Sequence, residues 1–93
     1  MVTTEIKTLK KIDASGAPKL DAALKAAIDG GELEIVVDMA DTTYISSVGL
    51  RAFASAQKKM NKLGGTMVLR NAQDCIKEIF EVTGFGGILT FEE

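Results

Sequence analysis

A nearly continuous apolar run, Leu33 to Met39, lies near the middle of the chain between two segments with helical periodicity. Such a run is typical of a central strand that is covered on both faces, or nearly so. Asp38 interrupts the run near its carboxyl end. We therefore expect a buried strand at the centre of a sheet, with helices packed against it.

Helical periodicity precedes and follows this strand. Leu20, Leu24 and Ile28 recur at four-residue spacing and form one apolar stripe, and Gly30-Gly31 supplies a left-handed stop. After the strand, a second apolar helix face is made by Leu50, Phe53, Met60 and Leu63. Gly64-Gly65 ends this second helix in the same way. The sequence thus predicts one helix on each side of the central strand.

The remaining segments complete an alternating pattern. Thr3 to Lys11 alternates apolar and polar side chains and predicts one amphipathic strand, while residues 66–69 and 88–91 predict two short strands. The apolar face of a third helix is made by Cys75, Ile76, Ile79 and Phe80. The order β-α-β-α-β-α-β predicts a single α/β domain over residues 1–93, with a mixed, mostly parallel four-stranded sheet and about three helices.

Composition narrows the partners and the compartment. The net charge of −2 argues against nucleic acid, which recruits basic patches. No apolar run approaches the roughly 20 residues that span a bilayer, so we expect no direct membrane insertion. The N-terminus lacks a secretion pattern, and the single Cys75, expected to be a core thiol, cannot form an internal disulfide. These features predict a cytoplasmic protein.

The sequence contains no histidine. This excludes Ser-His-Asp and Cys-His catalysis and removes the commonest neutral metal ligand. Asp38 and Asp41 are two carboxylates that could bind Mg²⁺ or act in acid–base chemistry, but no other ligand type accompanies them, which favours solvated or capping acids. A nucleophilic Ser47 would lack a base. We therefore expect no catalytic, metal or cofactor-binding residues, and no enzyme activity.

Two adjacent hydroxyls, Ser46 and Ser47, lie between the central strand and the second helix. Considered locally, the simpler interpretation is an N-cap that accepts a hydrogen bond from the first turn. Capping and phosphorylation are compatible, because the helix N-terminus favours a negative charge by about 0.3–1 kcal/mol at an exposed site. A phosphate there would present a dianion to any partner that lies across the turn.

The chain resembles the STAS domain family, which includes anti-sigma factor antagonists and the cytoplasmic domains of sulphate transporters. The resemblance covers roughly residues 12–91 and is carried by the order and spacing of short motifs. Residues 45–50, Ile-Ser-Ser-Val-Gly-Leu, resemble the signature turn that is usually written I-D-S-S-G-L. The other motifs are Ile12-Asp13-Ala14 with Pro18 and Leu20, Ile35-Val36-Val37-Asp38, Gly64-Gly65 with Met67, Leu69 and Asn71, and Val82-Thr83-Gly84-Phe85.

The resemblance implies a regulatory role. Free-standing members of the family, when unphosphorylated, bind an anti-sigma factor that is also a serine kinase and so release a sigma factor for transcription. The kinase then phosphorylates the signature serine, which ends the complex, and a serine phosphatase resets it. The alternative is a scaffold that does not switch, as a partner of a membrane transporter or a signalling assembly. The oligomeric state stays open.

By position, Ser47 matches the family's phosphoacceptor, with Ser46 as the alternate. Ser46 takes the place of the family's aspartate, and Val48 that of its second hydroxyl residue. The family usually begins with two strands, whereas only one is expected here before Ile12, so one sheet edge is open to pairing with another chain. The expected partner-binding surface comprises Asp38, Asp41, Thr42, Thr43, Ser46, Ser47, Val48, Gly49 and Arg51.

Overall fold

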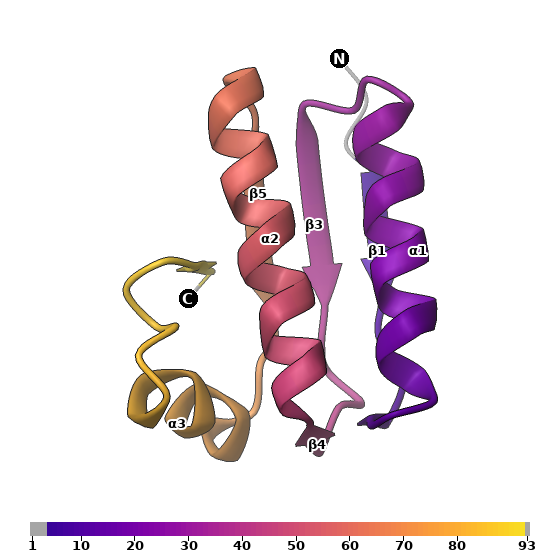
Figure 1. Ribbon diagram of the computed structural model, residues 1–93. Coiled ribbons are helices and arrows are strands. Elements are labelled where there is room, and N and C mark those ends of the chain that lie inside the picture. Colours follow the sequence, from indigo (N-terminus) through magenta and orange to yellow (C-terminus); the bar gives the residue numbers. More distant parts are fainter. Residues whose placement is uncertain (1–3, 93) are drawn as a thin grey trace.

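The computed structural model describes residues 4–92, so Thr3 of the first expected strand and the terminal Glu93 lie outside it. Its main sheet has four strands in the order β1-β3-β5-β6, and all neighbours in this sheet are parallel (Figure 1). The strands are β1 (Thr4–Lys7), β3 (Glu34–Asp38), β5 (Thr66–Arg70) and β6 (Thr90–Phe91). The predicted α/β architecture with a mostly parallel four-stranded sheet is therefore confirmed, and every pair in the main sheet is parallel.

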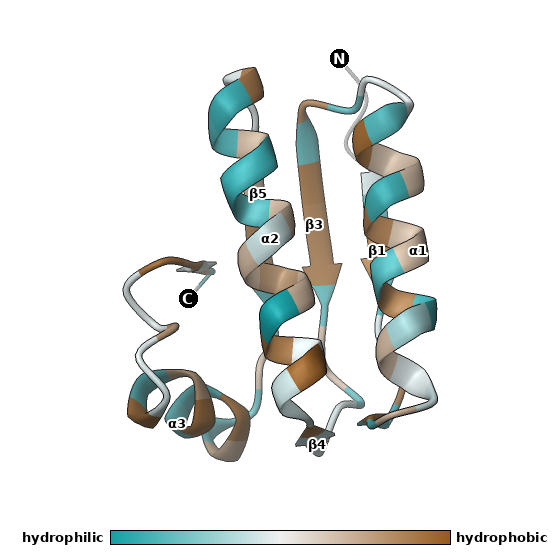
Figure 2. Cartoon of the chain, in the orientation of Figure 1, coloured by the Kyte–Doolittle hydropathy of each residue, from teal (hydrophilic) through white to brown (hydrophobic). Residues whose placement is uncertain are grey.

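Three helices accompany the sheet, namely α1 (Gly16–Asp29), α2 (Ser47–Leu63) and α3 (Asp74–Val82). In Figure 1, α1 and α2 lie side by side in front of the strands, and their amino ends point the same way. Figure 2 shows that β3 is strongly hydrophobic, whereas much of the visible surface of the two helices is hydrophilic. The apolar stripes of α1 and α2 therefore pack against the sheet.

The helices cover one face of the sheet. In β3, Ile35 and Val37 are buried while Val36 is only half-buried. The expectation of a central strand covered on both faces is therefore wrong. Val36 is apolar but points to the open face, where its register neighbour on β5 is Val68. The continuous apolar run therefore does not indicate burial of every residue, because burial alternates along this strand.

Aromatic contacts join the carboxyl-terminal third of the chain to the core. Phe80 of α3 packs edge-on against Phe53 of α2, with ring centroids 5.9 Å apart, and against Phe91 of β6 at 5.3 Å. Because Ile76 and Phe80 occupy the buried side of α3, Cys75 is turned to solvent. The expectation that Cys75 is a core thiol is therefore wrong.

A second, two-stranded sheet pairs β2 (Lys11–Ile12) with β4 (Tyr44–Ile45) in parallel. The segment predicted as one strand is thus divided into β1 and β2, which corrects the expectation of a single strand before the first helix. Figure 1 places β4 directly at the amino end of α2. This small sheet therefore fixes the turn that leads into α2. None of the helices in residues 4–92 has the length and hydropathy needed to cross a membrane.

Candidate functional site

The two serines of the turn have different structural roles. Ser46 is the N-cap of α2, with an extended backbone at φ −86° and ψ 169°. Its Oγ accepts a hydrogen bond from the Gly49 backbone N–H at 3.2 Å, and its own N–H donates to the Ile12 carbonyl at 2.8 Å. Ser46 is half-buried. Its hydroxyl is therefore committed to holding the helix terminus.

Ser47 is the first residue of α2 and is exposed. Within residues 4–92, its hydroxyl makes no hydrogen bond to another protein group. The first turn of α2 contains no acidic residue. A hydroxyl in this position is accessible, and the positive end of a 17-residue helix lies beneath it. The turn therefore has one hydroxyl that caps the helix, on Ser46, and one that is available to a partner, on Ser47.

Gly49 fits the helix onto the domain's own small sheet. A Cβ at this position would lie 2.7 Å from Cγ2 of Ile12 and 2.9 Å from Cγ1 of Ile45. Gly49 is buried. The close approach that the glycine permits is thus internal to the domain, and the structure places Gly49, an expected partner-binding residue, in the buried contact between α2 and the small sheet.

The segment before the turn contains both buried and exposed residues. Thr42 is fully buried, and its Oγ1 donates to the Leu9 carbonyl at 2.7 Å and hydrogen-bonds with the hydroxyl of Thr8. The structure thus places Thr42, an expected partner-binding residue, inside the domain, where its side chain ties the loop before β4 to the β1–β2 connection. Thr43 and Asp41 are exposed, and the Asp41 carboxylate pairs with Lys7 at 3.3 Å.

Exposed apolar side chains flank Ser47. Tyr44 is 48% exposed and Val48 is 54% exposed. Val48 also lines a shallow groove of about 340 Å³ between α1 and α2. The other residues of this groove are Ala17, Pro18, Asp21, Arg51, Ala52 and Ser55. The available hydroxyl therefore lies at the border of an apolar surface that a protein partner could cover.

Arg51 follows Ser47 by about one helical turn and is exposed. Within the described part of the chain, it makes no salt bridge. Across the groove, Asp21 of α1 is paired with Lys25 at 3.0 Å. The expected site residues on this end of α2, Ser47, Val48 and Arg51, are thus brought together as a mixed apolar and cationic surface.

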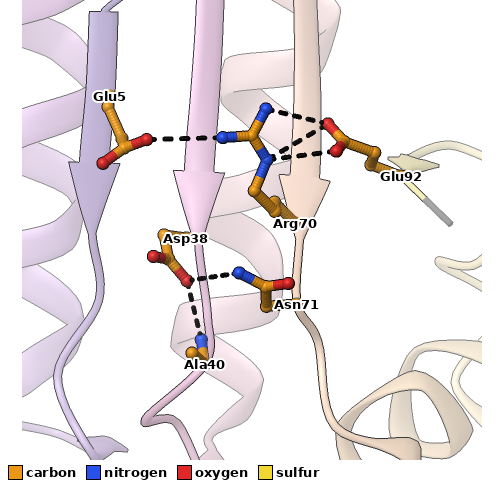
Figure 3. Close-up of polar contacts among 6 residues, drawn as sticks. All are labelled: Glu5, Asp38, Ala40, Arg70, Asn71 and Glu92. Atoms are coloured by element: carbon orange, nitrogen blue, oxygen red, sulfur yellow. Dashed lines mark hydrogen bonds and ion pairs between the residues drawn. The ribbon is translucent and has the colours of Figure 1, made fainter.

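Asp38 lies on the open face of the sheet, on the side away from α2 (Figure 3). Its carboxylate accepts hydrogen bonds from the Ala40 N–H at 3.0 Å and from Nδ2 of Asn71 at 3.3 Å. The Ala40 N–H, followed by the Asn71 amide, lowers the pKa of Asp38 below its usual value. The carboxylate is thus engaged within the domain and does not join the surface around Ser47.

Sequence reasoning missed a clamp on residue 40, which is the set of hydrogen bonds that joins Ala40 to Asp38 and Gln73. Besides the bond to Asp38, the Ala40 carbonyl accepts a hydrogen bond from Nε2 of Gln73 at 3.0 Å. Asn71 follows β5 and has a left-handed backbone at φ 60°. An asparagine directly after a predicted strand was the available sequence signal, since asparagine adopts the left-handed conformation more readily than most residues. Together these contacts hold the loop that leads into β4.

The amino end of α1 has its own cap, which lies next to the small sheet. Asp13 Oδ1 accepts hydrogen bonds from the N–H groups of Ser15 and Gly16, at 3.1 Å and 2.9 Å, and from the Ser15 hydroxyl at 3.0 Å. The Gly16 N–H, followed by the Ser15 hydroxyl, lowers the pKa of Asp13. The sequence pattern Asp-x-Ser-Gly is the signal for such a turn.

Comparison with known proteins gives consistent matches. The sequence model described as STAS domain matches residues 4–93. The chain is 35% identical to BtrV of Bordetella bronchiseptica, which carries the name of an anti-sigma factor antagonist, over 74 residues that cover 80% of this chain and 64% of that relative. It is 30% identical to the anti-sigma-B factor antagonist of Listeria monocytogenes over 79 residues, covering 85% of this chain and 69% of the relative. The chain thus spans about two thirds of the length of these relatives.

Solved structures share the fold. The unphosphorylated form of the anti-sigma factor antagonist SpoIIAA superposes with a TM-score of 0.77 at 18% identity, over 100% of this chain and 84% of that one. The phosphorylated form of SpoIIAA gives a TM-score of 0.75 at 17% identity, over 98% and 83%. The NMR structure of TM1081 gives 0.84 at 15% identity, over 98% and 74%. At these identities the similarity establishes the architecture.

Proposed function

The chain belongs to the STAS domain family, and we propose that it is an anti-sigma factor antagonist switched by phosphorylation of Ser47. Unphosphorylated, it binds an anti-sigma factor serine kinase in the cytoplasm and so frees a sigma factor for transcription. The proposal rests on the different structural roles of the two serines in the turn. Ser46 caps α2, and Ser47 leaves its hydroxyl exposed at the same helix terminus.

The proposed chemistry is performed by the partner. The kinase transfers the terminal phosphoryl group of ATP to Oγ of Ser47, so that the new Oγ–P bond replaces the bond to ADP. A base of the kinase takes the hydroxyl proton. Because the capping bond from Gly49 to Ser46 does not involve the acceptor oxygen, α2 keeps its amino end after modification. The domain contributes a positioned hydroxyl, and a serine phosphatase reverses the transfer.

Phosphorylation would act directly on the docking surface. Along the chain, the exposed Tyr44 precedes the acceptor and the exposed Val48 follows it, and Thr43, Asp41 and Arg51 are exposed polar residues of the same segment. A phosphate adds about −1.5 to −2 charges. The helix dipole favours this charge, whereas a partner that covers Val48 and Tyr44 must desolvate it. The modified domain therefore stays folded and loses its partner.

Transfer of phosphate to single-serine variants tests the acceptor. The cognate kinase and ATP are incubated with the wild type, Ser46→Ala and Ser47→Ala, and the products are mapped by mass spectrometry. We expect one phosphate on Ser47 in the wild type and in Ser46→Ala, and none in Ser47→Ala. Phosphate on Ser46, or on neither serine, would contradict the proposed switch.

A scaffold that does not switch is the second candidate. The departures from the family's turn favour it, because Ser46 and Val48 replace an aspartate and a hydroxyl residue that flank the acceptor in the family pattern. The Ser47→Asp variant separates the two functions. Loss of partner binding supports the switch, and unchanged binding supports the scaffold.

A further inference from the structure

We propose that the outer side of α2 docks an acidic protein surface through a cationic stripe, which comprises Arg51, Lys58, Lys59 and Lys62. The inference rests on the proposed function, because the stripe begins one helical turn after Ser47 and its partner is the same anti-sigma factor kinase. It adds the chemistry that the kinase must present to this domain. Asp and Glu side chains of the kinase would lie along α2 when the complex forms.

The helical period places the proposed phosphoacceptor and the stripe on one side of α2. Arg51 follows Ser47 by four residues, and Lys58 and Lys62 follow it by 11 and 15, which are close to whole turns of 3.6 residues. Phe53 is fully buried and marks the opposite, inner side. At 1.5 Å per residue, the line from Ser47 to Lys62 is about 22 Å long. A partner with an interface of ordinary size can therefore contact the whole line.

The stripe carries charge that the domain itself does not neutralise. Its members are all exposed, and none of them forms a salt bridge within residues 4–92. α2 contains no Asp or Glu, whereas α1 carries both signs and pairs Lys25 with Asp21 at 3.0 Å. Figure 2 shows hydrophilic segments along the side of α2 that faces away from the sheet. Positive charge is thus concentrated on one side of this helix, although the net charge of the chain is −2.

Helix stability does not explain the whole stripe. Lys62 lies in the last turn, where a cation complements the helix dipole. Arg51 lies toward the amino end, where the dipole offers a cation no such benefit. Lys58 and Lys62 are four residues apart, and like charges at this spacing destabilise a helix. An acidic partner surface would relieve this repulsion, so the stripe is better suited to a complex than to the free domain.

The surroundings of the stripe favour a protein over a nucleic acid or an anionic membrane. Arg51 also lines the groove between α1 and α2, whose apolar members include Pro18, Val48 and Ala52. Apolar area beside charged groups is typical of a protein interface. Asp21 lines the same groove and would repel the phosphate groups of either polyanion. The net charge of −2 opposes the approach of a polyanion as well.

Association kinetics with the cognate kinase test the stripe. The wild type is compared with Lys58→Glu/Lys62→Glu and with a matched control, Lys19→Glu/Lys77→Glu, which makes the same change in net charge on α1 and α3. We expect the α2 variant to associate at least about tenfold more slowly at about 50 mM salt, and the control to associate like the wild type. The difference should shrink at about 500 mM salt, because salt screens exposed charges. Thermal unfolding of each variant verifies the fold.

Zero-length cross-linking tests the contacts directly. A water-soluble carbodiimide condenses a lysine amine with a carboxylate, with loss of water, where the two groups are already in contact. In the complex of the wild-type chain with the kinase, we expect amide bonds from Lys58 or Lys62 to Asp or Glu residues of the kinase, identified by mass spectrometry. Lys19 lines the groove beside β1 instead, so it should form none.

The outcomes separate this inference from the proposed function. If the kinase phosphorylates Ser47 while the α2 variant associates like the wild type, the stripe is refuted and the switch stands. If the α2 variant associates slowly but Ser47 is not phosphorylated, the stripe stands and the switch fails. If the kinase does not bind the unmodified chain, both proposals fail. Lysine-dependent binding of a DNA duplex or of phosphatidylserine vesicles, with no effect of the stripe on the kinase, would assign the stripe to a polyanion and overturn the inference.

Discussion

At the scale of single residues, the serine turn shows how neighbouring hydroxyls acquire separate tasks. Ser46 has an extended backbone and supplies the cap, while Ser47 has already entered the helix and is exposed. Aspartate and serine are both good N-caps. Ser46 can therefore replace the family's aspartate as a cap while leaving the turn without a carboxylate.

Removing the cap should cost stability, whereas removing the acceptor should not. We expect Ser46→Ala to lower the free energy of unfolding by about 1 kcal/mol, the usual value for a lost N-cap. Ser47→Ala should change it by less than about 0.5 kcal/mol, as is normal for an exposed position. Urea unfolding followed by circular dichroism measures both. A larger loss for Ser47→Ala than for Ser46→Ala would show that the cap is misassigned.

Gly49 permits the contact between α2 and the small sheet. We expect Gly49→Ala to destabilise the domain by about 1–3 kcal/mol, because the added methyl group would overlap Ile12 and Ile45. Gly87→Ala is a matched control, since nothing lies within 4 Å of its added Cβ. Thermal or urea unfolding gives the comparison. Equal stability of the two variants would contradict the described packing.

At the scale of elements, loops are positioned by contacts that are distant in sequence. The loop before β4 is held through Ala40, whose N–H donates to Asp38 and whose carbonyl accepts from Gln73. Asn71 completes the clamp with its amide. Asp38 and Ala40 precede the serine turn by several positions, whereas Asn71 and Gln73 follow it by more than twenty. The clamp therefore acts on the partner surface only through the backbone.

The hydrogen-bonded carboxylates of Asp13 and Asp38 should make stability depend on pH in the acid range. The pKa values of Asp13 and Asp38 are lowered by hydrogen bonds from backbone N–H groups and neighbouring side chains. A lowered pKa contributes stability above the ordinary value of 3.8, and this contribution is lost as pH falls through the folded-state pKa. We expect Asp13→Asn and Asp38→Asn each to reduce the pH dependence of the melting temperature below pH 4. Unchanged dependence in both variants would refute these assignments.

The helices and the main strands could be predicted because their periodicity is local. Leu20, Leu24 and Ile28 specify the buried face of α1 without reference to any other segment. The two-residue strands β2 and β4 could not be found in this way, because they exist only through pairing with each other. Burial of Thr42 and exposure of Cys75 likewise depend on tertiary neighbours, the Leu9 carbonyl for one and the packing of Ile76 and Phe80 for the other.

At the scale of the whole molecule, the domain has two layers, with one sheet face open. Arg70 crosses that face and pairs with Glu5 of β1 and with Glu92 beyond β6 (Figure 3). The hydrogen bond and charge of Glu92, followed by the charge of Glu5, raise the pKa of Arg70. These charged groups lie on the same sheet face as the half-buried Val36 and Val68. The open face is thus charged, unlike the apolar border around Ser47.

The central claim is that one phosphate on Ser47 prevents the partner kinase from docking while the domain stays folded. Isothermal titration of the anti-sigma factor kinase with the unmodified and the Ser47-phosphorylated chain measures this directly. We predict that phosphorylation weakens binding at least about 100-fold, equivalent to about 2.7 kcal/mol. Equal affinity of the two forms would contradict the account.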